Sequence, residues 1–288
     1  MPDKDILKNI KKLRELTGVG FKDCKLAIDE NNGDIEKSID YLRKKGIAKA
    51  SKKMSRTAAD GLVLIYHSNN KTSALEINSE TDFVAKNKDF INFCKEVSEI
   101  NHKNNGDLKK TKKIKMKNNK TVDESLINLI SKIGEKITLR RSKYFDDTGK
   151  NFYYVHNSLE KNIGKVLSIV KLQTDNDFDA KDIGLKLAMH IAASAPIAID
   201  KDGIKKEILD KELEIIKEEL KNSGKKIDII DKISQGKLNK FVSDNTLLNQ
   251  IWIMDPKKKV KDVLKDYSKS SSIQILDFVR YKVGEGIE

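Results

Sequence analysis

The hydrophobic pattern of this chain changes its period at Gly61, and the order of periods that follows occurs twice. After Gly61, two stretches with strand-like alternation precede two helical stretches and a further strand. A similar order returns from Phe152 onward, and the strand-to-helix junctions are alike, with TDFVAK at 81–86 and TDNDFDAK at 174–181. We therefore predict an α+β fold with two related core subdomains, each with a small, mostly antiparallel sheet.

The residues before Gly61 indicate a separate helical module. Apolar residues recur at helical spacing in three short stretches, and Asn31-Asn32-Gly33 forms a turn before the third. A Lys-, Ala- and Ser-rich linker follows. The predicted domains are a three-helix module at 1–45, a linker at 46–60, a core N-subdomain at 61–144, and a core C-subdomain at 145–203 and 244–288.

An insertion at 204–243 interrupts the second subdomain. Its apolar residues predict two amphipathic helices at 204–221 and 226–241, joined by Asn222-Ser223-Gly224, and thus a projecting helical hairpin. The apolar stripe of this arm either joins its own two helices or meets another chain, which would make the protein a homodimer.

The expected core elements follow from the same periodicities. Strands are expected at 62–66, 74–77, 136–144, 152–155, 166–172 and 272–283, and helices at 82–100, 122–133, 179–195 and 260–267.

Several classes of function lack their sequence signals. The chain contains no GxxxxGK[ST] phosphate loop, and its four histidines and two cysteines show no metal-ligand spacing. We expect no catalytic constellation, no cofactor and no metal. A transmembrane run of about 18 apolar residues is also lacking. Cys24 and Cys94 lie far apart in sequence, which indicates a reducing compartment, and we expect a cytoplasmic protein.

The chain is basic, with 57 Lys and Arg against 44 Asp and Glu, but only six of the basic residues are Arg. Readers of nucleic acids usually depend on Arg. This composition favours a lysine-rich solvated surface over an RNA-binding footprint. Residues 109–120 are unusually basic, and form either a solvated loop or an electrostatic patch for an acidic surface or ribosomal RNA.

The peptide Thr81-Asp82-Phe83-Val84 allows two interpretations. In the first, Asp82 caps a helix N-terminus while Phe83 and Val84 pack inward. In the second, Phe83 projects from the start of the helix as a rigid apolar plug for a pocket of a partner, with Asp82 beside it.

Six peptides, in this order, resemble those of bacterial elongation factor Ts. They are LRELTGVGFKDCK at 13–25, NGDI at 32–35, TDFVAKN at 81–87, KIGE at 132–135, HIAAS at 190–194 and VGEGIE at 283–288. They span nearly the whole chain, and the first and third are highly specific. Some members of this family continue into a further C-terminal helix, whose contact with the partner we expect to be absent.

The resemblance implies a guanine-nucleotide exchange factor for elongation factor Tu. It also implies a ubiquitin-associated-like (UBA-like) N-terminal module, a core of two subdomains and a coiled-coil arm. In that family, the phenylalanine of the Thr-Asp-Phe-Val motif acts as a wedge that disturbs the Mg²⁺ site of the partner and loosens GDP. The matching wedge residues here are Asp82 and Phe83, flanked by Thr81 and Val84.

By the same resemblance, further contacts with the partner fall on three groups of residues. Those groups are Arg14 and Lys25 in the module, Ile133, Gly134 and His156 in the core, and Ile253 and Met254 near the C-terminus. Each also has an ordinary structural role open to it, such as a solvated helix position, a helix C-cap or a strand residue.

Two other classes of function stay open. A ribosome- or RNA-associated basic protein would use the lysines of 109–120, and its affinity would fall steeply with salt. A scaffold would bind a partner without changing nucleotide release.

Overall fold

Strand β1 (Asp60–Ser68) is apolar on both faces, so it requires cover on both. Leu62 and Leu64 point into one hydrophobic cluster, while Val63 and Ile65 point into another. This alternation places β1 inside a layered core. The computed structural model describes residues 3–17, 19–175, 179–223, 227–268 and 272–287.

The first sheet contains β1, β2 (Lys71–Ser79), β3 (Thr138–Phe145) and the short β5 (Ile163–Gly164), in the order β3-β2-β1-β5. Asn69 and Asn70 join β1 to β2, with φ values of 50° and 56°. Positive φ at both central residues is typical of the type I′ turn, whose twist matches a two-residue hairpin.

The second sheet repeats this arrangement with β4 (Lys150–His156), β6 (Val166–Thr174) and β9 (Ile273–Lys282), in the order β4-β6-β9. In both sheets the second strand of the subdomain lies between the first and the last. A register shift follows the sixth residue of the middle strand in each sheet, after Glu76 and after Lys171. The shared position of these bulges supports the internal repeat.

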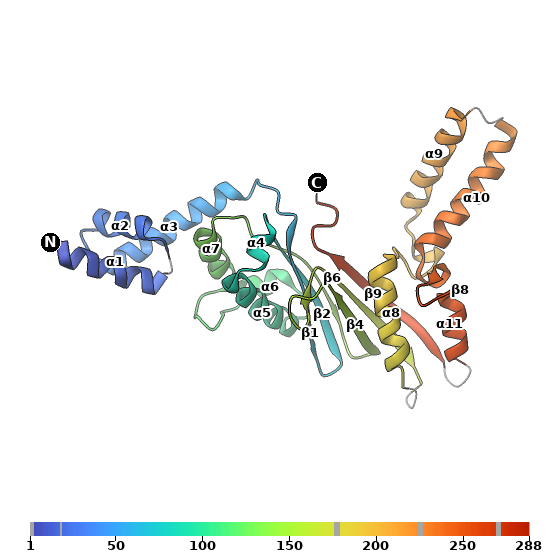
Figure 1. The fold of residues 1–288 in the computed structure, drawn as a ribbon, viewed down its shortest axis with the longest axis horizontal. Coiled ribbons are helices and arrows are strands. Elements are labelled where there is room, and N and C mark those ends of the chain that lie inside the picture. Colours follow the sequence, from blue (N-terminus) through green and yellow to red (C-terminus); the bar gives the residue numbers. More distant parts are fainter. Residues whose placement is uncertain (1–2, 18, 176–178, 224–226, 269–271, 288) are drawn as a thin grey trace.

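The two sheets pack face to face, and helices cover their outer faces (Figure 1). The layer between the sheets includes Val63, Ile65, Leu167, Ile169 and Val279. On the outer face of the first sheet lie α5 (Lys88–Lys103) and α7 (Val122–Ile133), and on that of the second α8 (Lys181–Ser194) and α11 (Val260–Tyr267). The core thus has four layers, and the predicted α+β class is confirmed.

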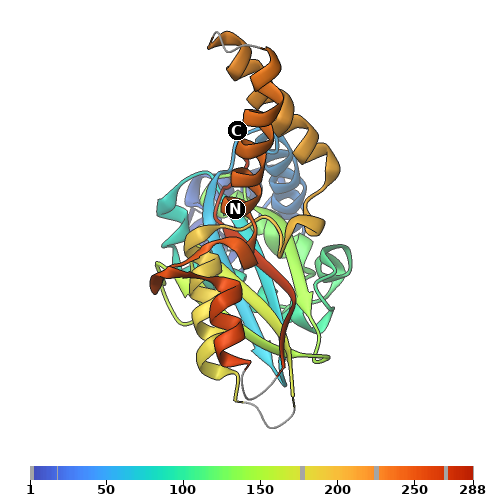
Figure 2. The ribbon, with the colours of Figure 1, turned by 90° about the vertical axis from the view of Figure 1, so that its right-hand side faces the viewer.

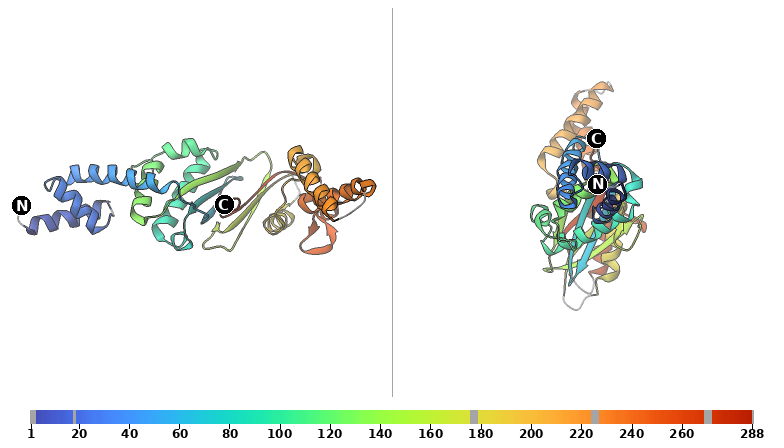
Figure 3. Two further views of the ribbon diagram at one scale, coloured as in Figure 1. Left: turned by 90° about the horizontal axis from the view of Figure 1, so that it is seen from above. Right: turned by 90° about the vertical axis from the view of Figure 1, so that its left-hand side faces the viewer.

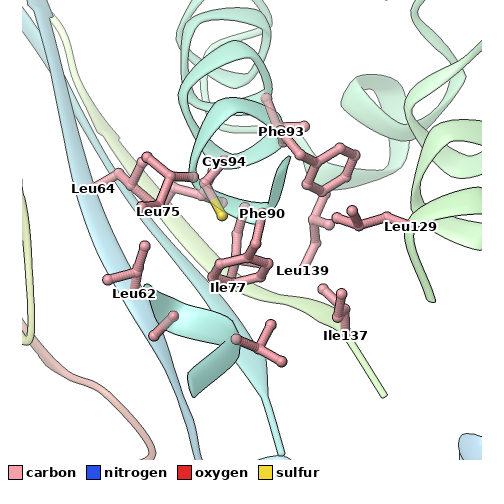
Figure 4. Packing of buried hydrophobic residues seen from close by; sticks show 14 of the residues in the cluster. Leu62, Leu64, Leu75, Ile77, Phe90, Phe93, Cys94, Leu129, Ile137 and Leu139 are labelled. Carbon is pink, nitrogen blue, oxygen red and sulfur yellow. The ribbon is translucent and has the colours of Figure 1, made fainter. Parts of the chain in front are cut away.

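Phe90 fills the centre of the helix-covered side of the first sheet and is fully buried. Figure 4 shows it packed against strand residues Leu62 and Ile77, which face each other across β1 and β2, with Leu129 of α7 nearby. Burial of one such aromatic side chain contributes about 1.5–3 kcal/mol to the free energy of folding.

The helix expected at 82–100 is interrupted, which corrects the prediction. The structure has a four-residue helix α4 (Asp82–Ala85) followed by α5. The side chain of Asn87 caps α5 by accepting the backbone N–H groups of Asp89 and Phe90, so the chain restarts a helix there. A further helix, α6 (Leu108–Lys113), had no prediction.

The N-terminal helices are α1 (Asp3–Thr17), α2 (Phe21–Glu30) and α3 (Ile35–Lys53), and they enclose a small apolar core of their own. Helix α3 continues into the segment 46–60, so the first half of the expected linker is helical. Arg43 of α3 forms an ion pair with Glu124 of α7, and Lys53 Nζ donates to the carbonyl of Gly134. These contacts join the module to the core.

The inserted arm consists of α9 (Lys206–Asn222) and α10 (Ile227–Asn245), which project from the far end of the molecule (Figures 2 and 3). Ile216, Leu220 and Ile230 are buried between the two helices. The apolar stripe therefore packs within the arm, and homodimer formation stays a prediction. The flanking elements are η1 (Lys201–Gly203), η2 (Leu247–Asn249), β7 (Ile251–Trp252) and β8 (Asp255–Lys259).

A buried carboxylate, that of Glu76, ties the C-terminal segment to the first sheet. Its oxygens accept from Arg140 (2.9 Å), Arg141, the Asn78 amide (3.0 Å) and the backbone N–H of Gly284 (2.9 Å). The bulge beside Glu76 allows two consecutive arginines to reach it. Burial alone would raise the pKa of Glu76, but these hydrogen bonds lower it.

Within the described ranges, no helix is long and apolar enough to cross a lipid bilayer. The domain boundaries stay a prediction.

Two glycines of the C-terminal segment provide a matched test of this anchorage. Gly284 and Gly286 have φ of 74° and 75°, but a Cβ on Gly284 would lie 1.9 Å from the carbonyl oxygen of Ala59, whereas one on Gly286 would meet only Arg140 at 3.9 Å. We expect Gly286→Ala to lower the free energy of unfolding by about 1 kcal/mol through backbone strain. Gly284→Ala should lower the free energy of unfolding by about 1–3 kcal/mol more than Gly286→Ala does, because of the close contact. Urea denaturation of both variants measures the difference, and equal losses would contradict the close contact.

Candidate functional site

Phe83 is the most exposed of the large apolar side chains in the described part of the chain, with 78% of its surface accessible. It is the second residue of α4, which follows directly from the end of β2. A single exposed phenylalanine is ordinary on a protein surface. What distinguishes this one is that the backbone on both sides of it is fixed.

On the C-terminal side of Phe83, Val84 and Ala85 are buried in the cluster beneath α5. On the N-terminal side, the carboxylate of Glu135 holds Thr81 by two hydrogen bonds. It accepts the backbone N–H of Thr81 at 3.0 Å and the Thr81 hydroxyl at 2.8 Å. An isolated turn of four residues is not stable in water, so these contacts hold α4 in place.

Asp82 does not cap the helix, which corrects the first of the two interpretations. Thr81 occupies the N-cap position without a capping hydrogen bond from its side chain. The carboxylate of Asp82 instead accepts from Lys86 Nζ at 2.8 Å, and this hydrogen bond lowers the pKa of Asp82. The Lys165 ammonium lowers it further, and Lys165 itself pairs with Asp60. The ion pairs around Phe83 are therefore locally balanced in charge.

Ile133 and Gly134 lie at the end of α7, next to the residue that holds Thr81. Gly134 ends the helix in the left-handed conformation, with φ of 91°, which favours glycine. Ile133 is half-buried and packs against the core cluster. Lys136, just beyond, donates its backbone N–H to Glu80 at 2.6 Å, so this turn is bonded both to Thr81 and to the residue before it.

His156 is exposed at the end of β4, and its Nδ1 lies 3.1 Å from the hydroxyl of Tyr154. Its carbonyl accepts the backbone N–H of Lys165 at 3.3 Å, which connects it to the residue whose charge acts on Asp82. The structure thus links His156 to the Phe83 region through Lys165.

The other predicted contact residues lie elsewhere along the molecule. Arg14 and Lys25 are exposed on α1 and α2, at one end of the long axis. Ile253 and Met254 are 44% and 43% exposed, and lie in the turn between β7 and β8 near the other end. The candidate site is therefore divided among three positions (Figure 1).

A buried histidine fixes the turn that carries Ile253. The amide nitrogen of Gln250 donates to the carbonyls of Ser194 (3.0 Å) and Asp244 (2.9 Å), so its oxygen faces His190 Nε2 at 3.0 Å as an acceptor. Nε2 of His190 must then carry the hydrogen, and Nδ1 accepts the backbone N–H of Ile253 at 3.4 Å. Only the neutral ring satisfies both contacts.

Glu135 was not among the site residues predicted from the sequence. It lies 54 positions from Thr81, so periodicity could not connect the two. Its one signal was its place in the peptide KIGE, which carried the resemblance. Lys86 was missed in the same way, although its i,i+4 spacing to Asp82 favours a helix-face ion pair.

In the described ranges, no three side chains of His, Cys, Asp or Glu are grouped in a way that could hold a metal ion. The features present, an exposed aromatic side chain on a fixed backbone and two exposed apolar residues on a turn, are typical of a protein-binding surface.

His190 gives a pH-dependent prediction. Burial lowers its pKa, although the Gln250 hydrogen bond opposes this, whereas in the unfolded chain the pKa is about 6.5. As pH falls below about 6.5, the unfolded state binds a proton that the folded state does not, so stability falls. We expect His190→Gln, which can keep both contacts, to reduce this dependence by up to about 1.4 kcal/mol per pH unit between pH 6.5 and 5.

Urea denaturation at several pH values tests this, with the fluorescence of Trp252 as a local probe. Trp252 is the only tryptophan and stacks on His190 with 5.1 Å between ring centroids. Burial also lowers the pKa of His67 and His102, so a residual slope is expected in the variant. An unchanged slope would show that His190 does not contribute.

Comparison with known proteins identifies the family. The sequence profile described as elongation factor TS matches residues 80–285, a range that begins one residue before Thr81. The chain is 39% identical over 286 residues to elongation factor Ts of Maricaulis maris. It is 40% identical over 283 residues to the proteins of that name from Rhizorhabdus wittichii and Nitrobacter hamburgensis. Each match covers 97% of this chain and 92% of the relative. The resemblance seen in the sequence is thereby confirmed, and the chain belongs to the elongation factor Ts family.

Proposed function

We propose that this protein is a guanine-nucleotide exchange factor that binds elongation factor Tu in its GDP-bound and nucleotide-free forms. In this proposal the Asp82-Phe83 wedge disturbs the Mg²⁺ and phosphate site of the partner, so that GDP leaves and GTP can bind. The observation that carries the proposal is the 78% exposure of Phe83 on a backbone fixed at both ends. Membership of the elongation factor Ts family supports it.

A rigid wedge suits exchange because the factor must distinguish two states of its partner. If the factor weakens GDP binding by some ratio, GDP weakens binding of the factor by the same ratio. A ratio of about 10⁴ requires about 5.5 kcal/mol of differential binding free energy. A flexible phenylalanine would lose part of that energy in becoming ordered on the partner. Fixing Thr81 and Val84 beforehand removes the part of that loss that comes from the backbone.

Phe83 alone cannot supply this energy, since burial of one such side chain contributes only about 1.5–3 kcal/mol. We therefore infer that the other exposed groups also bind the partner. In this role Arg14 and Lys25 act from the N-terminal module, and Ile133, Gly134 and His156 act beside the wedge. Ile253 and Met254 act from the β7–β8 turn.

The proposed activity changes the affinity of a GTPase for its nucleotide, so the protein is a binding protein without a catalytic residue or cofactor of its own. We infer a cytoplasmic location from the function and from Cys24 and Cys94, which are free, buried thiols.

Phe83→Ala tests the wedge. Because the side chain is exposed, its removal should leave the free energy of unfolding within about 0.5 kcal/mol of the original value. The acceleration of GDP release should fall at least about tenfold, as expected for loss of about 1.4 kcal/mol or more of differential binding. The measurement is release of a fluorescent GDP analogue from purified elongation factor Tu with catalytic amounts of the full chain.

Ile215→Ala is the matched control, since Ile215 is 43% exposed on the arm and has no assigned contact with the partner. It should exchange nucleotide at the original rate. Full activity of Phe83→Ala would refute the wedge. Stable binding of elongation factor Tu with no effect on GDP release, even for the unmodified chain, would favour the scaffold function instead.

Glu135→Ala tests whether the wedge must be held in place. Loss of both hydrogen bonds to Thr81 should lower the maximal exchange rate by about tenfold, in line with about 1.5–3 kcal/mol for hydrogen bonds to a charged group. Glu135→Gln keeps one acceptor oxygen, so its maximal exchange rate should lie between those of Glu135→Ala and the unmodified chain. Because Phe83 itself is unchanged, the concentration of factor that gives half the maximal rate should change less than the rate. A change in that concentration alone would indicate that Glu135 only supports binding.

A further inference from the structure

The positive charge of this chain is concentrated in one short segment. Residues 109–120 contain seven lysines and no acidic residue, so they carry +7 of a net +13. The remaining 276 residues together carry only +6, the difference between these two values. Composition drift spread evenly along the chain would not produce such a concentration. We name this segment the lysine loop.

The lysine loop is folded. Asp107 caps α6 by accepting the backbone N–H groups of Lys109 and Lys110, and Thr111 is buried against Asn101. After α6, the side chain of Met116 is only 7% exposed and belongs to the core cluster.

The turn that follows is closed by backbone hydrogen bonds. The N–H of Met116 donates to the carbonyl of Lys120 at 2.8 Å, and the N–H of Val122 donates to that of Ile114 at 2.9 Å. The backbone is thus fixed from inside while the lysines lie outside.

Most of these lysines are available to a ligand. Six are exposed, and Lys112 is half-exposed. Among the described residues, Lys110 is the one member that lies within ion-pair distance of a carboxylate, at 3.8 Å from Asp107. By contrast, Lys86 and Lys165 near Phe83 both have carboxylate partners. Three carboxylates nearby offset part of this charge: Glu96 accepts the backbone N–H of Lys117 at 2.5 Å, and Lys117 and Lys120 help to lower the pKa values of Glu99 and Glu124. With seven lysines in twelve residues, the loop is still a source of positive potential.

The side chains of the loop favour one class of anion. Energetically important contacts between proteins rely on aromatic and Arg side chains, and residues 109–120 contain neither. Of the groups that read bases, the loop contains no Arg and two Asn, and the side chain of Asn118 is held within the protein by Ser125 and Lys120. Lysine is a point charge that suits phosphate oxygens without regard to sequence. These properties fit the phosphate backbone of a nucleic acid better than an acidic protein surface.

We propose that the lysine loop, residues 109–120, is a binding surface for the phosphate backbone of structured RNA, independent of base sequence. This surface is distinct from the proposed exchange wedge. The loop joins the first residue of α7, whereas Thr81 is bonded beside its last turn. At 1.5 Å per residue, the 12 residues of α7 separate the two by about 18 Å. The same molecule can therefore contact RNA and its protein partner at different places.

Binding of a fluorescein-labelled RNA duplex to the full chain tests the proposal by fluorescence anisotropy. We expect a dissociation constant of about 1–100 µM near physiological salt, as for non-specific binding. A second duplex of unrelated sequence should bind equally well. The logarithm of the association constant should fall linearly with the logarithm of salt concentration, by about 0.7–0.9 per phosphate contacted.

The test variant replaces Lys109, Lys113, Lys115 and Lys120 with Gln, because these side chains are exposed and form no ion pair within the described ranges. The matched control replaces four exposed lysines of the arm, which lowers the net charge by the same four units. These are Lys206, Lys211, Lys221 and Lys232. In the loop variant, we expect the slope of the logarithm of the association constant against the logarithm of salt concentration to become less steep by about 3. Its affinity for RNA should fall at least tenfold. The arm variant should lose less than threefold.

Four results would overturn the proposal. One is the absence of RNA binding below about 1 mM at physiological salt. Another is an equal loss in the loop and arm variants, which would indicate general attraction by net charge. A preference for one duplex sequence would contradict independence of base sequence. Finally, tighter and loop-dependent binding of polyglutamate would identify an acidic protein surface as the partner.

Nucleotide exchange measured on the same two variants keeps this proposal separate from the proposed function. Both variants should accelerate GDP release like the unmodified chain. If the unmodified chain binds RNA through the loop but does not accelerate GDP release from elongation factor Tu, the proposed exchange function is refuted and the proposed RNA-binding surface is supported.

Discussion

The apolar layer between the two sheets is the contact on which the rest of the molecule depends. Val63 and Ile65 of the first sheet meet Leu167 and Ile169 of the second, so neither subdomain has an exposed inner face. Face-to-face packing allows little sliding, because side chains of both sheets interdigitate. Phe83, carried by the first subdomain, and the β7–β8 turn, carried by the second, are consequently parts of one body. A partner can be contacted at both places without first paying to order them.

Polar contacts then hold two segments that the apolar layer does not reach, the C-terminal segment and the start of α4. Glu76 joins β2 to two arginines of β3 and to the backbone at Gly284, so it ties the last residues of the chain to the first sheet. Glu135 does the same for the start of α4. Both carboxylates accept several hydrogen bonds, which is the condition under which a buried or half-buried charge stabilises a fold. Each also serves a segment too short to be stable on its own.

Periodicity in the sequence was enough to predict the class of fold, the repeated order of elements and most strands, because each depends on local alternation. Prediction from periodicity failed where a single side chain determined the local structure. Asn87 divides the helix expected at 82–100, and its capping role is not visible in a continuing apolar stripe. The site was only partly predictable for a related reason. Phe83 belongs to a recognisable peptide, but the partner of Thr81 lies across the fold, and no local rule connects residues so far apart.

Helix α7 connects the separate parts of the surface. Its first residue follows the lysine loop, its middle faces the core, and its end leads to Glu135, while Arg43 of the N-terminal module pairs with Glu124 near its start. The Phe83 region and the lysine loop differ in charge. The cations around Phe83 are paired with carboxylates, so this part of the surface attracts polyanions only weakly at long range. The loop has the opposite character: among the described residues only Lys110 of its seven lysines forms an ion pair, and it contains no aromatic side chain. Such a division lets the α7 scaffold present an apolar contact and an electrostatic one that do not compete for the same ligand.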